Sequence, residues 1–176
     1  WTGDLTGTAN PATLTMNGNK AVVAHFAACN PVTSLASTTT AKSATVTWTT
    51  PTGQTAELRY KKSTAAWPTT APFGWAAATS PKTLTALTPG TLYNVEVRTV
   101  CGTGIYATTV AGTFTTKLLG DVNCDGVVNV LDVIVLTNYI MGTQASTQCI
   151  LDGGDLNGDG QINVLDVVAL INIVLG

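Results

Sequence analysis

The residues best suited to bind a ligand lie near the end of the chain, where oxygen-bearing side chains recur at a fixed spacing. A twelve-residue segment beginning at Asp121 has a counterpart 34 residues later, beginning at Asp155. Between residues 121–142 and 155–176, 12 of 22 positions are identical. The chain therefore contains an internal repeat whose copies are expected to fold alike.

The spacing of the oxygen donors in each copy suits a calcium loop. Ca²⁺ takes six to eight oxygen ligands at about 2.3–2.6 Å, and a twelve-residue loop supplies them from positions 1, 3, 5, 7, 9 and 12. Position 7 contributes a main-chain carbonyl and position 9 often acts through a water. The ligands expected in the first loop are Asp121, Asn123, Asp125, Val127, Asn129 and Asp132. Those expected in the second loop are Asp155, Asn157, Asp159, Gln161, Asn163 and Asp166.

Two further positions agree with this interpretation, and one departs from the usual loop. Gly126 and Gly160 stand at position 6, where the chain turns sharply and positive φ is needed. Position 8 is apolar in both copies, so Val128 and Ile162 can pair across the loops. Position 12 is Asp rather than Glu, and its shorter side chain has to come closer to the metal. We therefore expect two Ca²⁺ ions.

Each loop runs directly into one expected helix, over Val130–Met141 and Val164–Leu175, with no helix before it. This duplicated loop and helix, about 22 residues long, resembles the dockerin module of secreted bacterial enzymes. The resemblance covers Gly120–Gly176 and implies a small α-helical domain of two F-hand units. It also implies a calcium-dependent fold that docks on a cohesin of a scaffold or cell-surface protein, in the setting of polysaccharide degradation.

The resemblance also indicates which residues contact the partner protein and recognise it. In the dockerin family these are largely loop positions 10 and 11 and helix positions 17 and 18. Carried over, they are Val130, Leu131, Thr137 and Asn138, with Val164, Leu165, Ile171 and Asn172 as their symmetry mates. Cellulosomal dockerins often place small polar and basic residues there, whereas this chain has mainly aliphatic residues and Asn. The near-symmetry of the copies indicates binding in two orientations.

Charge is divided unevenly along the chain. The net charge is −2, yet all eight Lys and Arg residues precede Leu118, and seven of the ten acids lie between Asp121 and Asp166. Six of those acids are expected ligands, and bound cations would relieve their mutual repulsion. The sequence shows no basic patch that would suggest nucleic acid. No run reaches the roughly 18 apolar residues of a membrane span.

Residues 31–116 read as short strands separated by turn signals every 8 to 12 residues or so, which predicts an all-β sandwich. The expected strands are Val32–Ala36, Ala44–Thr49, Ala56–Lys61, Thr83–Leu87, Leu92–Cys101 and Gly112–Thr115. Alternation predicts that the inward residues are Val46, Trp48, Leu58, Tyr60, Tyr93, Val95 and Val97.

The segment from Leu87 to Tyr93 predicts a corner in which the Tyr93 hydroxyl bonds back to the preceding turn. Together with Trp48 and Phe114, it resembles a fibronectin type III module over roughly Asn30–Thr116. In that topology the start of the first strand and the end of the strand finishing at residue 101 share a pole. A disulfide between the cysteines at 29 and 101 is therefore geometrically reasonable.

The four cysteines are expected to form two disulfides, Cys29–Cys101 and Cys124–Cys149. The second would pin the first calcium loop to the segment before the second loop. No spacing of Cys and His suggests zinc. An even number of cysteines in a chain with few charges suits an oxidising, extracellular setting.

The sequence predicts a multidomain chain with units at 1–28, 29–117 and 118–176. In the first, Leu14–Met16 and Ala21–Phe26 are expected to form a β-hairpin around Asn17-Gly18. This stretch resembles the second half of an internalin B-type repeat of bacterial surface proteins. The linker of residues 117–120 is short and contains Leu118 and Leu119, so we expect the last two modules to touch.

Catalysis is not expected. The single histidine, His25, excludes most acid–base triads, no glycine loop would cradle phosphate, and most acids are committed to metal. We expect the non-catalytic C-terminal region of a secreted or cell-surface bacterial protein, docking through its calcium-ordered helices with the sandwich as spacer.

Two alternatives stay open. The repeat could be a calcium-stabilised structural cap on its own sandwich, or an assembly module that joins another extracellular subunit. Trp67 and Trp75 could instead stack on a glycan, if their rings stand exposed side by side rather than folded over the edge of the sandwich.

Overall fold

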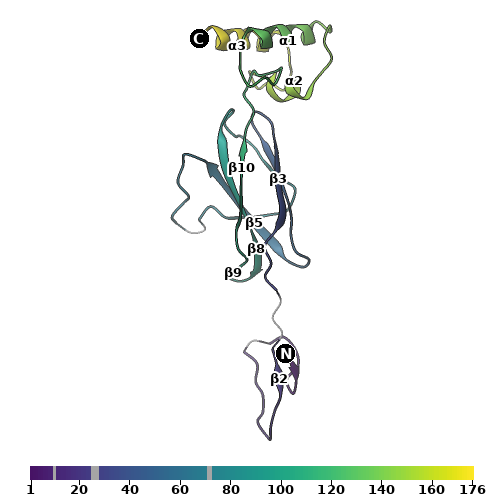
Figure 1. Cartoon of the computed structure of the whole chain (residues 1–176), viewed down its shortest axis with the longest axis vertical. Coiled ribbons are helices and arrows are strands. Elements are labelled where there is room, and N and C mark those ends of the chain that lie inside the picture. The colour runs from purple at the N-terminus through teal and green to yellow at the C-terminus, as the bar shows by residue number, and fades with distance from the viewer. Residues whose placement is uncertain (10, 25–27, 71–72) are drawn as a thin grey trace.

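The computed structural model describes residues 1–9, 11–24, 28–70 and 73–176. Three parts follow one another along the long axis: a two-stranded N-terminal piece, a β-sandwich and a helical module of residues 120–176 (Figure 1). His25 and the end of the strand expected up to Phe26 lie outside the described residues. Within those residues, no helix is long and apolar enough to cross a membrane.

The sandwich consists of two antiparallel sheets, as expected for its strand pattern. The smaller sheet has the order β3 (Thr33–Thr39), β4 (Ala44–Thr49), β7 (Lys82–Leu84). The larger has the order β10 (Val110–Thr115), β8 (Leu92–Gly102), β5 (Thr55–Lys62), β6 (Ala76–Ala78), and β9 (Ile105–Tyr106) also pairs with β8. Every strand pair is antiparallel, so short connections suffice.

The core of the sandwich lies between the alternating inward residues of β4 and β8. Val46 and Val97 are fully buried and Val95 is nearly so, because every second residue of a strand points to the same face. Tyr60 was expected inside but is 41% exposed. Its strand pairs with β6 only through residues 56–58, so the flank beside Tyr60 stays open.

Strand ends differ from the expected bounds where local backbone geometry intervenes. The strand expected over Thr83–Leu87 ends at Leu84, because Ala86 takes a φ of 57° and the Leu87 N–H donates to the Lys42 carbonyl. Strands β6 and β9 were not expected. The all-alanine β6 gives little strand signal, since alanine is depleted in strands and shows no alternation.

The N-terminal piece pairs differently from the expected hairpin. Strand β1 (Thr2–Gly3) pairs antiparallel with β2 (Val22–Val23), and Leu14–Met16 is not a strand. The Asp4 carboxylate accepts a hydrogen bond from the Ala21 N–H at 2.8 Å. This bond fixes the start of the chain beside the second strand, a pairing that the Asn-Gly turn signal did not indicate.

The helical module contains α1 (Val130–Ile140), α2 (Gln148–Gly153) and α3 (Val164–Leu175). Helices α1 and α3 agree with the expected bounds to within one residue. The expectation of no helix before either loop is wrong for the second loop, which follows α2. At six residues α2 is too short to show a helical periodicity, although Thr147 caps it by accepting from the Ile150 N–H.

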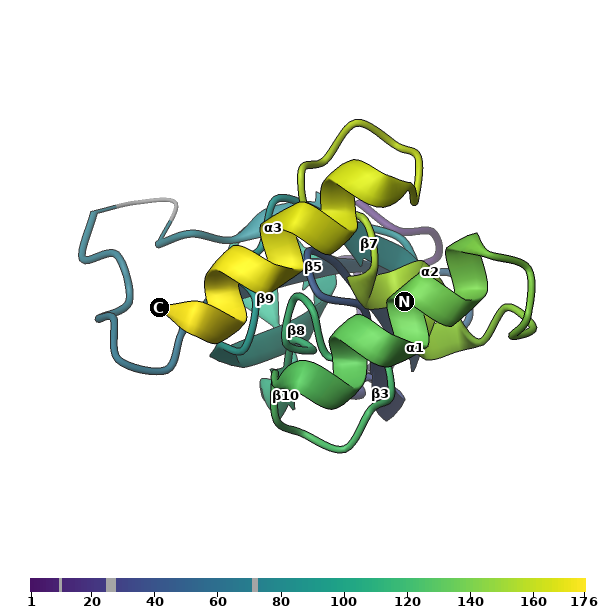
Figure 2. The same cartoon turned by 90° about the horizontal axis from the view of Figure 1, so that it is seen from above.

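Helix α2 completes the small core of the module. Helices α1 and α3 lie side by side at the end of the molecule (Figure 2). The fully or almost fully buried side chains beneath them are Val122, Leu136, Ile150 and Leu170. Ile150 comes from α2, so two apolar helices and one short turn of helix enclose a common centre.

Both expected disulfides are present. Cys29 and Cys101 have their Cα atoms 5.6 Å apart and join the start of the sandwich to the end of β8. A cross-link over 72 residues of sequence stabilises by about 4 kcal/mol in the chain-entropy account. Cys124 and Cys149, with Cα atoms 5.8 Å apart, join the first loop to α2.

The tyrosine corner predicted from the sequence is formed, and it can be tested. The Thr88 N–H donates to the Tyr93 hydroxyl at 2.9 Å, and the Tyr93 ring stacks on Phe114. Tyr93→Phe keeps the ring but leaves that N–H without its acceptor, so the free energy of unfolding should fall by about 1–3 kcal/mol in urea titrations. Tyr60→Phe, at an exposed position, should change it by less than about 0.5 kcal/mol. Equal effects of the two substitutions would contradict this role of the corner.

Candidate functional site

Each of the two acidic loops is wound around the carboxylate at its first position. The Asp121 carboxylate accepts from the N–H groups of Asp125 and Gly126, both at 3.1 Å. The Asp155 carboxylate accepts from the N–H groups of Gly158 and Gly160, at 2.7 and 3.1 Å. These bonds draw the chain into a tight curl around one acidic group.

Glycine at position 6 permits this curl. Gly126 and Gly160 have φ values of 87° and 85°, in the left-handed region where a side chain would be strained. Both expectations for position 6 are therefore confirmed. At position 8, Val128 and Ile162 are half-buried and pack on the core of the module.

The carboxylate at position 12 closes each loop onto its helix. Asp132 and Asp166 are completely buried. Asp132 Oδ1 accepts from the N–H groups of Val122 and Asn123, and its Oδ2 accepts from the Asn129 N–H at 2.9 Å. Because a buried charge is tolerated only when it is well hydrogen-bonded, this network holds the loop in one conformation.

The second loop repeats that network bond for bond. Asp166 accepts from the N–H groups of Leu156 at 2.8 Å, Asn157 at 3.2 Å and Asn163 at 2.9 Å. Asn163 also caps α3, with its side-chain oxygen accepting from the Leu165 N–H. The loop, the buried carboxylate and the helix start therefore form one unit, present twice.

The side chains at positions 3 and 5 are hydrogen-bonded to each other and to the main chain of the loop. Asn157 donates to Asp159 Oδ2 at 3.0 Å, and the Gln161 N–H donates to Asp159 Oδ1 at 2.8 Å. The N–H of Gln161, followed by the amide of Asn157, lowers the pKa of Asp159 below its ordinary value. Asp159 therefore stays ionised to lower pH than a free aspartate, as a cation ligand requires.

The chemistry of the donors fits a hard cation. The expected ligands are carboxylate, amide and main-chain oxygens, with no sulfur or ring nitrogen among them. At position 12, the Oδ2 atoms of Asp132 and Asp166 each accept one hydrogen bond and keep a second lone pair. Among the residues described, no three His, Cys, Asp or Glu side chains meet closely enough to form a metal cluster by themselves. Amide and carbonyl oxygens would have to complete each set, so the twelve ligands remain a prediction.

A second candidate surface lies on α1 and α3. Six exposed aliphatic side chains there, each between 51% and 63% exposed, occupy equivalent positions in the two copies. We call them the apolar helix face: Val130, Leu131, Ile134, Val164, Leu165 and Val168. Their spacing of i, i+1 and i+4 places them on one side of each helix, and the two sets are symmetry mates in the repeat.

The residues that the dockerin resemblance indicated fall partly on this face. Four of the eight belong to it, and Ile171 and Asn172 are exposed farther along α3. Thr137 and Asn138 are only half-buried, and the Thr137 hydroxyl donates to the Val133 carbonyl. Ile134 and Val168 were not among the residues expected there, although their i+4 spacing from the first residue of each helix would have indicated them.

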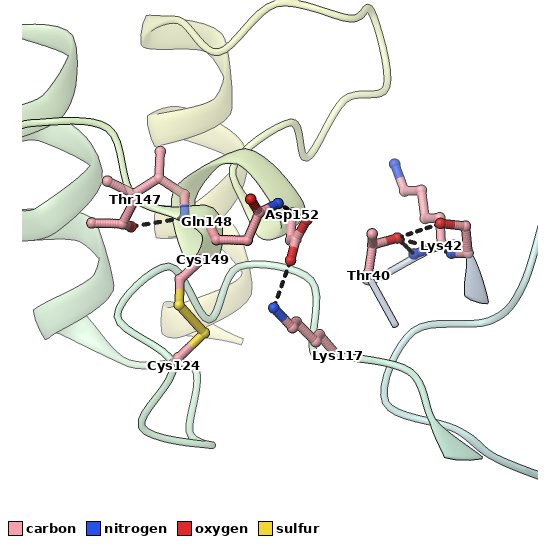
Figure 3. Close-up of polar contacts among 10 residues, drawn as sticks. Thr40, Lys42, Lys117, Cys124, Thr147, Gln148, Cys149 and Asp152 are labelled. Atoms are coloured by element: carbon pink, nitrogen blue, oxygen red, sulfur yellow. Dashed lines mark hydrogen bonds and ion pairs between the residues drawn. A yellow bond between two sulfur atoms is a disulfide. The ribbon is translucent and has the colours of Figure 1, made fainter. Parts of the chain in front are cut away.

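The last two modules touch, as the short linker predicts (Figure 3). The Lys117 ammonium lies 2.5 Å from Asp152 Oδ2, and the Lys42 ammonium donates to the Asp155 carbonyl at 3.4 Å. Helix α2 lies on the sandwich side of α1 and α3 (Figure 1). The apolar helix face is therefore left uncovered by the sandwich.

The tryptophans at 67 and 75 do not form an exposed stacking platform. Trp75 is only 8% exposed, and the guanidinium groups of Arg59 and Arg98 lie 4.5 and 4.2 Å from its ring centre. Arg59 also lies 4.1 Å from the centre of the half-buried Trp67 ring. These cation–π contacts hold the two rings against arginines of β5 and β8 and occupy the ring surfaces that a sugar would need.

Comparison with known proteins finds two domain families in the chain. Residues 119–175 match the dockerin type I domain, and residues 30–114 match the fibronectin type III domain. No curated protein matches the chain at a significant level.

Solved structures similar to the chain contain β-sandwich domains. One is a fibronectin type III domain of human collagen XX, with 22% identity, 55% of this chain and 99% of that chain covered, and a TM-score of 0.42. Another is a two-domain segment of chicken tenascin, with 21% identity, coverage of 58% and 61%, and a TM-score of 0.42. A computationally redesigned β-sandwich protein shows 24% identity, coverage of 51% and 92%, and the same TM-score.

Removal of a buried carboxylate should destabilise the helical module. Asp166→Asn keeps the shape of the side chain but replaces one acceptor oxygen by an NH₂ group that opposes a main-chain N–H. In calcium, the free energy of unfolding of the helical module should fall by about 2–3 kcal/mol. Circular dichroism at 222 nm measures this, because the described helices all lie in this module. Asp4→Asn, at a more exposed carboxylate in the N-terminal piece, is the control, and a similar loss for the helical module there would contradict the assignment.

Proposed function

We propose that this chain, which carries a fibronectin type III domain followed by a dockerin type I domain, is the docking region of a secreted multimodular protein. The sandwich serves as a spacer, and the helical module docks on a partner. The observation that carries the proposal is the apolar helix face, which is exposed, duplicated and free of charge. A contiguous apolar surface of this kind marks a protein interaction site.

Calcium would order this face. In our proposal each loop holds one Ca²⁺ through its oxygens at positions 1, 3, 5, 7, 9 and 12. When bound, the ions neutralise the carboxylates, which have no basic residue on their own module to offset them. The buried Asp132 and Asp166 then transmit the order of each loop to the helix that begins beside it.

The partner is expected to be cohesin-like and to present an apolar surface. Helices α1 and α3 contain only one charged residue each, and both of these are buried. Docking therefore depends on buried apolar area rather than on ion pairs, and salt should affect it little. The repetition of the same side chains on both helices supports binding in two orientations.

The alternative of a cap on its own sandwich has less support. A cap would bury the apolar helix face against β-strands, whereas the junction uses the linker, α2 and the second loop. An assembly module that joins another extracellular subunit would use the same face and differs only in the partner. Glycan adhesion through Trp67 and Trp75 has no support from the packing of those rings.

The disulfides and the types of module indicate where the protein is located. Two disulfides and two modules of extracellular type indicate an extracellular protein, and we propose secretion to the surface of a bacterium, beside enzymes of polysaccharide degradation. Both modules are non-catalytic. We place the domain boundaries at 1–28, 29–117 and 118–176, with Cys29 fastening the start of the sandwich.

Calcium removal tests the docking mechanism directly. A cohesin-bearing surface should retain the whole chain in calcium and release it in EDTA, with at least about a hundredfold loss of affinity because the helices lose their anchor. Surface plasmon resonance with a cohesin panel measures this. Equal retention under both conditions would refute the calcium dependence. Retention by none of the panel, with intact calcium binding, would favour the assembly alternative.

Charged substitutions on the apolar helix face test which residues meet the partner. Because the two copies offer equivalent faces, Leu131→Glu alone should weaken binding only severalfold. The double variant Leu131→Glu, Leu165→Glu should lower affinity by at least about a hundredfold, since a buried unpaired charge is costly in either orientation. Leu151→Glu, at an equally exposed position on α2, is the matched control and should bind normally. Calcium titrations would show that all three variants stay folded.

A further inference from the structure

The two calcium loops are identical at eight of their twelve positions but have different neighbours at position 4. Cys124 fills this position in the first loop with a φ of 59°, and Gly158 fills it in the second with a φ of 79°. Cys124 is bonded to Cys149 of α2. Gly158 has no side chain, and a Cβ placed on it would lie 3.6 Å from the Lys42 Nζ of the sandwich.

A lysine of the sandwich therefore lies against the second loop. The Lys42 Nζ donates to the carbonyl of Asp155, whose carboxylate is the expected first ligand of that loop. Within the described residues, no lysine or arginine forms a hydrogen bond or ion pair with the first loop. One loop thus has a cation at its rim, and the other has a disulfide.

Hydrogen bonds within the sandwich hold the main chain of Lys42 in place. It lies in the turn between β3 and β4, where its N–H donates to Thr40 Oγ1 at 3.3 Å and its carbonyl accepts from the Leu87 N–H at 2.9 Å. The Lys117–Asp152 ion pair holds the two modules together close by (Figure 3). The sandwich therefore holds the main chain of Lys42 where its ammonium group can reach the second loop.

We infer that Lys42 sets the calcium affinity of the second loop, so that the two loops fill at different calcium concentrations. This rests on the proposed calcium sites. A positive charge beside a divalent site repels the ion and also favours the empty, acidic loop, and both effects weaken binding. By reciprocity, filling the second loop loosens the contact between Lys42 and the helical module. The sandwich is then a regulator of docking as well as a spacer.

The test is a calcium titration of the whole chain followed by NMR. The amide signals of Gly126 and Gly160 report the two loops separately, because each lies at position 6 of its own loop. Lys42→Met removes the charge but keeps the length of the side chain. It should shift the midpoint for Gly160 to about three- to tenfold lower calcium and leave that for Gly126 unchanged. Added salt should shrink the difference from the native chain.

Lys82→Met is the matched control, because it changes the net charge equally and, in the part of the chain that the structure describes, its ammonium forms no hydrogen bond or ion pair with the helical module. An unchanged Gly160 midpoint in Lys42→Met, or the same shift in Lys82→Met, would overturn the inference while leaving both calcium sites intact. A chain in which neither glycine responds to calcium would overturn the inference together with the proposed function.

Discussion

The structure of the helical module depends on two carboxylates that are buried without a basic partner on their own module. Asp132 and Asp166 are fully enclosed, and each is held by three main-chain N–H groups from the loop that it closes. Burying a charge is costly unless donors surround it. That requirement leaves each loop only one arrangement, and the arrangement fixes where the following helix begins.

This constraint explains how so small a module can leave apolar residues uncovered. Its core has only four fully or almost fully buried side chains, which is little for a domain of this size. The polar networks of the loops and the Cys124–Cys149 disulfide supply order that a larger core would otherwise provide. The outer sides of α1 and α3 are consequently free to serve a partner.

The sandwich determines which side of the helical module is covered. Lys42 of the sandwich contacts the second loop of the helical module, and Lys117 of the linker contacts α2. The apolar helix face therefore points away from the chain's own β-strands. The same contacts make the two repeat copies unequal, although their sequences are close to symmetric.

The sequence by itself determined the loops, the two long helices and the alternating core of the sandwich, because these follow from local spacing. Gly126 and Gly160, the inward Val46 and Val97, and the Tyr93 corner could all be identified from neighbours along the chain. Only the tertiary structure decided the pairing of β1 with β2, the exposure of Tyr60, the burial of Trp75 under two arginines and the approach of Lys42 to the second loop. Each of these depends on a partner remote in sequence or on where a neighbouring strand ends, and local spacing carries no record of either.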